Sequence, residues 1–179
     1  MPIRSAPSTV PVIETERLLL RGHTLDDFDD SAALWADPEV TRFIGGEPQT
    51  REEAWTRLLR YVGHWSVMGF GYWVVTDREA GRFAGEIGFA EFRRAIDPPI
   101  EGMPEMGWVL AGWARGRGFA TEAVRAALDW STAHFGPDQR TVCLIAPGNV
   151  ASIRVAEKCG YARTGEADFH GHPTLVFAR

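Results

Sequence analysis

The chain has 179 residues, of which 45% are hydrophobic and 24% are charged, which favours one folded domain and excludes collagen-like, disulfide-rich and disordered chains. Nineteen Lys and Arg residues against 24 Asp and Glu residues give a net charge of -5. This balance argues against nucleic acid or an anionic membrane as the main partner. Cys143 and Cys159 lack C-x-x-C spacing and nearby histidines, which indicates neither a disulfide framework nor a zinc site and fits a reducing cytosol.

The N-terminal segment 1–13 is rich in proline and serine and lacks a continuous apolar core, so we expect a flexible arm rather than a signal peptide. A single domain is then expected over 14–179. No stretch approaches about 18 consecutive apolar residues, so no membrane span is expected. We therefore predict a soluble, cytoplasmic protein, either a monomer or a homodimer.

The first predicted elements are a strand and a helix. The run RLLLR at 17–21 is short, apolar and bounded by charge, which favours a strand. Thr24 is followed three residues later by Asp27, a capping pattern that predicts a helix start. Apolar residues then recur at helical spacing until Asp37, which precedes a proline.

A second helix is predicted to begin at the capping box of Thr50 and Glu53. Four apolar residues form its expected buried stripe: Trp55, Leu58, Leu59 and Val62. The runs at 72–77 and 82–92, with a polar turn between them, predict a β-hairpin. The proline-rich segment 93–104 is then expected to be a loop.

The second half of the chain predicts one strand–helix–strand unit followed by smaller elements. Strands are expected at 105–110 and 141–146, joined through a helix at 121–135, so the two strands should be parallel neighbours. A short helix should run from Asn149 to a stop at Gly160, before a hairpin at 161–179. The longer helix has a face shared by six residues: Ala120, Val124, Ala127, Leu128, Ser131 and Phe135.

A glycine-rich loop, RGRGFA at 115–120, lies between the predicted strand and that helix. The first N–H groups of a helix have no partner within it, and the helix dipole is positive there, so the loop predicts an anion site. The glycines permit close approach of the main chain, and Arg115 and Arg117 add mobile positive charge, which favours a pyrophosphate over a carboxylate. The string required for a P-loop does not occur, and a dinucleotide fingerprint would need Gly or Ala where Thr121 stands.

The loop resembles that of the GCN5-related N-acetyltransferases (GNAT), whose pattern [RQ]-x-x-G-x-[GA] is matched by Arg115, Gly118 and Ala120. The segments TERLLLR, EMGWVL, RGRGFATEA and NVASIRVAEKCGY are similar to the ribosomal-protein N-acetyltransferase (RimJ/RimL-like) branch. This resemblance covers nearly the whole chain from Glu14. The alternative is a glycine turn that only packs a helix on a strand.

The resemblance implies an α+β (mixed α/β) fold with a mostly antiparallel sheet of about seven strands and helices on both faces. The strands at 105–110 and 141–146, at the family's β4/β5 position, would splay apart, and the pantetheine arm of acetyl-CoA would fill the gap. Main-chain groups of Val109 and Leu110 would receive that arm and polarise the thioester. The residues implied in binding acetyl-CoA are Val109, Leu110, Arg115, Gly116, Arg117, Gly118, Phe119, Ala120, Thr121, Asn149 and Ser152.

The resemblance also names candidate acid and base groups. Glu105 matches a glutamate that many members carry at the start of this strand, where a carboxylate could take the proton directly or through a water, and a structural or substrate-orienting role is the alternative. The family's usual tyrosine acid, seven residues after Asn149, is replaced by Ala156, so Ser152 is the candidate donor to the sulfur. Tyr161 fits an aromatic packing position. Asn149 is expected beside the arm or, alternatively, only as a helix cap.

Three further residues carry alternative interpretations. Glu86 lies among small and apolar residues and is expected either to bind the acceptor ammonium or to be a solvated edge residue. His170 and His172 could share one side of a strand, but no third ligand is apparent, so no metal is predicted. They could instead flank the mouth of the acceptor site.

The sequence therefore predicts direct transfer of the acetyl group of acetyl-CoA to an amine. A protein N-terminal α-amine is the first acceptor, because its pKa of about 7.7–8.0 makes the neutral form accessible at pH 7. Alternatives are a small-molecule amine such as an antibiotic, polyamine or amino acid, a non-catalytic acyl-CoA-binding module, and a nucleotide-binding oxidoreductase. The segments expected to line the acceptor, 37–49, 93–104 and 168–173, are loops without a readable code.

Overall fold

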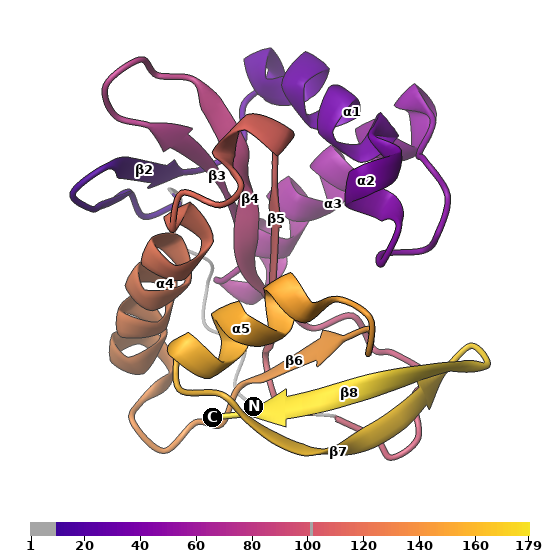
Figure 1. Cartoon of the computed structure of the whole chain (residues 1–179). Helices are drawn as coiled ribbons and strands as arrows, with labels where there is room; N and C mark the ends of the chain where they lie inside the picture. Colours follow the sequence, from indigo (N-terminus) through magenta and orange to yellow (C-terminus); the bar gives the residue numbers. More distant parts are fainter. Residues whose placement is uncertain (1–9, 101) are drawn as a thin grey trace.

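An eight-stranded sheet forms the centre of the computed structural model, which describes residues 10–100 and 102–179 (Figure 1). The strand order is β1-β2-β3-β4-β5-β6-β8-β7, and every pair of neighbours is antiparallel except β5 and β6. The strands are β1 (Ile13–Glu14), β2 (Leu18–Arg21), β3 (Tyr72–Asp77), β4 (Phe83–Ala90), β5 (Glu105–Leu110), β6 (Val142–Ile145), β7 (Ala162–Phe169) and β8 (His172–Ala178).

Helices cover both faces of this sheet (Figure 1). One face packs against α1 (Phe28–Ala36) and α3 (Arg51–Met68), with the short α2 (Pro38–Thr41) between them in the chain. The other face packs against α4 (Phe119–Phe135) and α5 (Val150–Lys158). Two 3-10 turns complete the elements, Leu25–Asp27 and Gly112–Ala114. The expected mixed fold is confirmed, with one strand more than predicted and with α2 as an additional helix.

The sheet divides between β5 and β6. These two strands are parallel, as predicted, but they share a single register pair, Glu105 with Val142. The Val142 N–H donates to the Pro104 carbonyl at 3.1 Å, and no further pairing follows in the described part of the chain. The strands diverge beyond this point (Figure 1), which leaves the β6-facing edge of β5 open along most of its length.

Residues 10–13, which the sequence assigns to the N-terminal arm, are held against the sheet. Ile13 and Glu14 form β1, and the indole N–H of Trp73 donates to the Pro11 carbonyl at 2.9 Å, so the expectation of a flexible arm is wrong for residues 10–13. Residues 1–9 lie outside the described part of the chain.

Helix α3 begins at the predicted capping box, with the Thr50 hydroxyl accepting from the Glu53 N–H at 3.2 Å. Its buried face differs from the prediction: Ala54, Leu58, Tyr61 and Trp65 are buried, whereas Trp55, Leu59 and Val62 are 37%, 49% and 44% exposed. The amphipathic aromatic residues decide the orientation, because Trp65 can bury its ring and still donate its indole N–H to the Tyr72 carbonyl at 2.8 Å.

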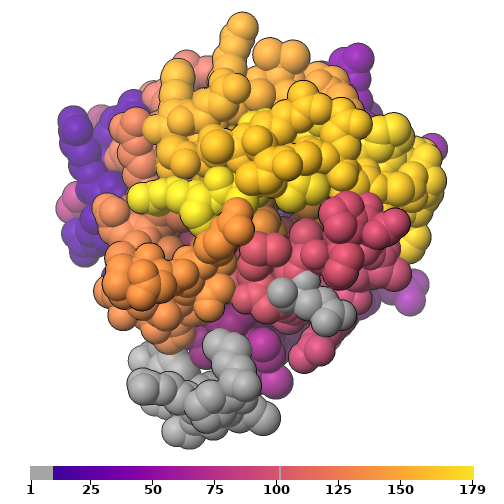
Figure 2. Space-filling view, turned by 90° about the horizontal axis from the view of Figure 1, so that it is seen from below, coloured from indigo at the N-terminus to yellow at the C-terminus, as the bar shows by residue number. Residues whose placement is uncertain are grey.

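The loop between β4 and β5 lies against the β7–β8 hairpin, as the rose and yellow surfaces in Figure 2 show. The Asp168 N–H donates to the Asp97 carbonyl at 3.1 Å, and Ile96 packs against Ala167 and Val176. Among the described residues, no helix is both long and apolar enough to cross a bilayer.

Candidate active site

The predicted anion loop has the backbone that such a site requires. Gly116 and Gly118 have positive φ angles of 71° and 80°, a conformation that costs residues with a side chain about 1–2 kcal/mol. Gly118 is the N-cap of α4 and offers no side chain to its first turn. The N–H groups of Phe119, Ala120 and Thr121 therefore remain available to an external acceptor.

The two loop arginines differ in their freedom. The Arg115 Nε donates to the Leu110 carbonyl at 3.1 Å, and its Nη2 lies 3.7 Å from Asp37, so this residue is anchored and not mobile as expected. The Arg117 guanidinium stacks on the rings of Phe119 and Trp113, 5.0 and 5.5 Å from their centroids. Arg117 thus remains beside the first turn of α4.

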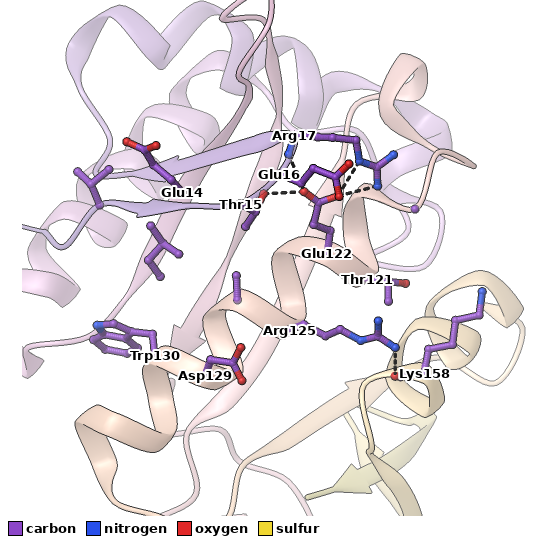
Figure 3. A pocket seen from close by; sticks show the side chains of 14 residues that line it. Glu14, Thr15, Glu16, Arg17, Thr121, Glu122, Arg125, Asp129, Trp130 and Lys158 are labelled. Carbon is purple, nitrogen blue, oxygen red and sulfur yellow. Dashed lines mark hydrogen bonds and ion pairs between the residues drawn. The ribbon is translucent and has the colours of Figure 1, made fainter.

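The N-terminal part of the chain fixes the position of α4 (Figure 3). The Glu122 carboxylate accepts from the Thr15 hydroxyl at 2.6 Å, the Arg17 N–H at 2.9 Å and the Arg17 Nε at 2.7 Å. Burial raises the pKa of Glu122, but these three donors outweigh it and lower the pKa below its usual value. The charged carboxylate therefore joins the segment between β1 and β2 to the helix that presents the anion site.

A surface groove of about 980 Å³ runs along this side of α4, and Gly118, Thr121, Arg125 and Lys158 are among its lining residues (Figure 3). The Arg125 Nη2 donates to the Lys158 carbonyl at 2.9 Å, which joins α4 to the end of α5. These two cations extend the positive region of the loop and were not predicted. For Arg125 the signal in the sequence is its position four residues after Thr121, which places Thr121 and Arg125 on one helix face.

The open edge of β5 is identified by its hydrogen-bond register with β4. The Ala111 N–H donates to the Ala84 carbonyl at 2.9 Å, and Glu86 stands opposite Val109. Antiparallel alternation then directs the main-chain groups of Val109 to β4 and those of Trp108 and Leu110 to the gap. Leu110 fits the predicted role in receiving an extended ligand, and the register favours Trp108 over Val109 as its companion.

The helix after β6 begins with the predicted asparagine cap. The Asn149 Oδ1 accepts from the Ser152 N–H at 3.2 Å, which confirms the capping role. The Ser152 hydroxyl has no hydrogen-bond partner among the described residues and is partly exposed. Phe43 from the segment after α2 lies close to Gly148, where an added Cβ would be 3.2 Å from its ring. One predicted acceptor-lining segment, 37–49, thus lies against the turn that leads from β6 into α5.

Glu105 is held in a two-pronged ion pair at the start of β5. Its carboxylate oxygens accept from Arg94 Nε at 2.6 Å and Arg94 Nη2 at 2.8 Å, and the residue is buried. Burial opposes the charge of Arg94, but the bond to Glu105 outweighs it and raises the pKa of the guanidinium. This arrangement favours the structural or orienting role over that of a free base.

Glu86 is fully buried, so the expectation of a solvated edge residue is wrong. Its carboxylate accepts from the Ser31 hydroxyl at 2.7 Å and the Trp35 indole N–H at 2.8 Å, and His23 Nε2 lies 3.3 Å away. Burial raises the pKa of Glu86, but these three partners lower it below its usual value. Because protein groups surround both oxygens, direct binding of an acceptor ammonium is not supported.

Two tyrosines from α3 and β3 form an aromatic floor beside β5. The rings of Tyr61 and Tyr72 stack with centroids 4.5 Å apart and planes 8° apart. The Tyr72 hydroxyl lies against Gly107, where an added Cβ would be only 2.0 Å from it, so glycine is required at that position of β5. Burial raises the pKa of Tyr61 to about 12 and that of Tyr72 well above 10, so both phenols are protonated at neutral pH.

Tyr161 is in the packing position that the sequence predicts. It is buried, its hydroxyl lies 2.8 Å from the Thr141 Oγ1, and burial raises its pKa. His170 occupies the turn of the last hairpin with φ 54°, whereas His172 begins β8, so the expectation that they share one side of a strand is wrong. No group of three or more potential metal-ligating His, Cys, Asp or Glu side chains occurs among the described residues.

An uncapped helix terminus beside the open edge of a split sheet fits the diphosphate and extended arm of an acyl-CoA, as in an acyltransferase, and comparison with known proteins agrees. Residues 17–162 match the family model described as an acetyltransferase (GNAT) domain. YkkB of Bacillus subtilis (strain 168) is 34% identical over 162 residues, covering 84% of this chain and 86% of YkkB. A GnaT-family structure from Bordetella pertussis superposes with a TM-score of 0.82 at 32% identity, covering 95% of this chain and 99% of the other.

The chain belongs to the GNAT acetyltransferase family and is an acetyl-CoA-dependent acetyltransferase. Two solved structures share its fold at 18% identity and a TM-score of 0.73. One is RimL, a ribosomal L7/L12 alpha-N-protein acetyltransferase in complex with coenzyme A, with 94% of this chain and 97% of that chain covered. The other is spermidine N-acetyltransferase from Vibrio cholerae in complex with CoA and spermine, with 92% and 96% covered.

Proposed function

We propose that this protein transfers the acetyl group of acetyl-CoA directly to a primary amine, with a protein N-terminal α-amine as the first candidate. The observation that carries the proposal is the position of the uncapped start of α4 beside the unpaired edge of β5. The helix terminus fits a diphosphate, and the edge offers the main-chain groups that an extended amide-containing arm requires. The RimJ/RimL-like segments of the sequence support placement in that branch.

In this proposal the chain's own residues have separate roles. The amides of Phe119, Ala120 and Thr121 bind the diphosphate, with Arg117 beside them. The main-chain groups of Trp108 and the Leu110 N–H bind the arm, and an N–H of this edge polarises the acyl carbonyl, while the Leu110 carbonyl accepts from Arg115. The Ser152 hydroxyl donates a hydrogen bond toward the thiolate, since Ala156 occupies the position of the usual acid.

The choice of an α-amine follows from the two carboxylates near β5. Glu105 is bound by Arg94, and Glu86 is enclosed by three protein partners, so neither is free to remove a proton from an ammonium group. An acceptor with a low pKa needs the least help: an α-amine costs on the order of 1 kcal/mol to deprotonate at pH 7, and a lysine roughly 4.6 kcal/mol.

The test is a thiol-release assay with acetyl-CoA across peptide N-termini, polyamines, aminoglycosides and amino acids. We expect turnover with at least one class of α-amine and faster turnover than with lysine side chains. Absence of thiol release from every amine, with acetyl-CoA bound, would reject the enzyme and leave an acyl-CoA-binding module, the role that the replacement by Ala156 favours.

A small-molecule amine is the second candidate acceptor, because both proteins and polyamines are substrates named for proteins of this fold. The same assay separates the two, since a small-molecule enzyme would turn over a free amine faster than any peptide.

A further inference from the structure

Three arginine side chains gather around the aromatic floor on the face of β5 opposite α4. Arg57 and Arg60 extend from α3, and Arg94 extends from the loop after β4. The Arg57 Nη1 lies 3.4 Å from the Tyr61 hydroxyl, and the Arg60 guanidinium lies 5.8 Å from the Tyr61 ring. The guanidinium groups of Arg60 and Arg94 lie 5.2 and 4.6 Å from the ring of Phe92, so one ring joins these two cations.

Only one of these cations is neutralised by a carboxylate. Arg94 is paired with Glu105, whereas Arg57 and Arg60 form no ion pair with any described residue. Arg57 stacks on the Trp35 ring at 3.6 Å and donates to the neutral Gln49 Oε1 at 3.0 Å.

The carboxylate one turn before Arg57 does not fill this role. Glu53 accepts hydrogen bonds from Thr50 at the start of α3, through its N–H at 2.8 Å and its hydroxyl at 3.0 Å. Partial desolvation and the neighbouring Arg57 and Arg94 guanidinium groups lower the pKa of Arg60. Like charges are therefore concentrated here, and neither Arg57 nor Arg60 has a carboxylate partner in the described part of the chain, an arrangement that an anion would stabilise.

The cluster lies beside the strand where the proposed transfer takes place. Tyr61 stacks on Tyr72, and the Tyr72 hydroxyl touches Gly107 in the middle of β5. Arg94 also contacts this strand directly through Glu105. A ligand that reaches the acyl group from this face therefore passes the Arg57 and Arg60 guanidinium groups.

We propose that the acceptor amine carries a carboxylate of its own, as an amino acid or an acidic peptide does, and that Arg57 and Arg60 bind this carboxylate. The inference rests on the proposed function, because it places the amine at β5. The planar guanidinium group binds carboxylates in a two-pronged geometry. A polycationic acceptor such as a polyamine is repelled by the same groups.

Binding of acetylated product analogues tests the site without turnover. Calorimetry is performed on the protein saturated with coenzyme A, with N-acetyl-L-alanine and with its carboxamide. We expect the carboxylate to bind at least tenfold more tightly, Arg60→Gln to reduce this ratio below threefold, and Arg60→Lys to restore part of it. Arg51→Gln is the matched control, since Arg51 is exposed on the same helix and paired with Asp29. Equal affinity for the two analogues in the unmodified protein overturns the inference.

Turnover then separates this inference from the proposed function and distinguishes the two sources of carboxylate. Thiol release is measured with L-alanine against alaninamide, and with the peptide amides Ala-Asp-Ala against Ala-Asn-Ala. A preference of at least tenfold for the carboxylate member of either pair supports the site. Equal turnover within both pairs rejects the carboxylate site and retains the transferase. Discrimination in binding without thiol release from any amine retains the site and rejects the transferase.

Discussion

At the scale of single residues, Glu86 joins three segments that are distant in the sequence. It lies in β4, while its partners Ser31 and Trp35 belong to α1 and His23 follows β2. Trp35 in turn carries the Arg57 guanidinium on its ring. A buried carboxylate thereby determines where one of the proposed acceptor-binding arginines lies, although it contacts no acceptor itself.

Removal of this carboxylate should destabilise the fold. We expect Glu86→Ala to lower the free energy of unfolding by about 3–5 kcal/mol, because three buried donors lose their acceptor. Urea denaturation measures the change. Glu79→Ala, on the exposed turn between β3 and β4, is the control and should cost less than about 0.5 kcal/mol. A similar small loss at both positions would contradict the assigned role of Glu86.

The same carboxylate should make the stability of the fold depend on pH in the acidic range. The pKa of Glu86 is lower in the folded chain than in the unfolded chain, so its contribution is present above the unfolded value of about 4.3 and is lost as the pH falls through the folded value. We expect unmodified protein to lose more stability between pH 7 and pH 3.5 than Glu86→Gln does. Parallel losses measured by denaturation at the two pH values would show that Glu86 is not preferentially ionised in the fold.

The contact between Gly107 and Tyr72 gives a paired prediction. Gly107→Ala places a Cβ within 2.0 Å of the Tyr72 hydroxyl, so we expect a loss of about 1–3 kcal/mol from overpacking. Tyr72→Phe removes the hydroxyl and should recover part of that loss in the double variant. Thermal denaturation of the four proteins gives the coupling, and strictly additive effects would show that the two groups do not meet.

At the scale of elements, α3 and α4 show what periodicity reveals and what it leaves open. The capping boxes and the glycine stop of α5 are local signals, and each is confirmed by the backbone. The buried face of α3 is not local, because apolar residues occupy two faces and only the sheet selects between them. The partners of the two buried carboxylates are not local either. Glu105 is bound by Arg94 from the loop after β4, and Glu86 by α1 and by His23 after β2. No spacing rule connects these segments to the two strands.

Truncation of two adjacent leucines on α3 should therefore have very different effects on the free energy of unfolding. Leu58 is 4% exposed and Leu59 is 49% exposed. We expect Leu58→Ala to cost about 2–5 kcal/mol and Leu59→Ala less than about 0.5 kcal/mol. Urea denaturation of both variants checks the orientation of the helix. A larger loss of stability for Leu59→Ala than for Leu58→Ala would contradict the buried face assigned to α3.

The start of α4 gives a prediction for coenzyme A. Gly118→Ala places a side chain at φ 80° in the terminus that is proposed to bind the diphosphate, and we expect at least tenfold weaker binding by calorimetry. Gly81→Ala is the matched control, with φ 66° in the turn between β3 and β4. It should cause comparable backbone strain without a change in affinity. Equal effects of the two substitutions would place the ligand elsewhere.

At the scale of the whole molecule, the sheet consists of two halves, β1–β5 and β6–β8, which are joined by a single register pair between β5 and β6. The sequence indicates the two hairpins and the crossover through α4, because alternation, turns and the glycine loop are local, but it does not indicate that β8 lies between β6 and β7. The prediction that β5 diverges from β6 rests only on the family resemblance, since nothing within EMGWVL or TVCLIA specifies how far the two strands stay paired. Helix α4 contacts β2, β4 and β5 on one side of the division, and α5 contacts β6 on the other.

The single register pair between Glu105 and Val142 also has a dynamic consequence. With so few bonds across the division, β1–β5 and β6–β8 can open to solvent as two units of different free energy. In deuterated water, amide protons on the two sides should exchange as two groups with separate protection factors. A bound ligand that bridges the division should bring the two groups together, so that slower deuterium uptake on both sides would report occupancy without any measurement of catalysis.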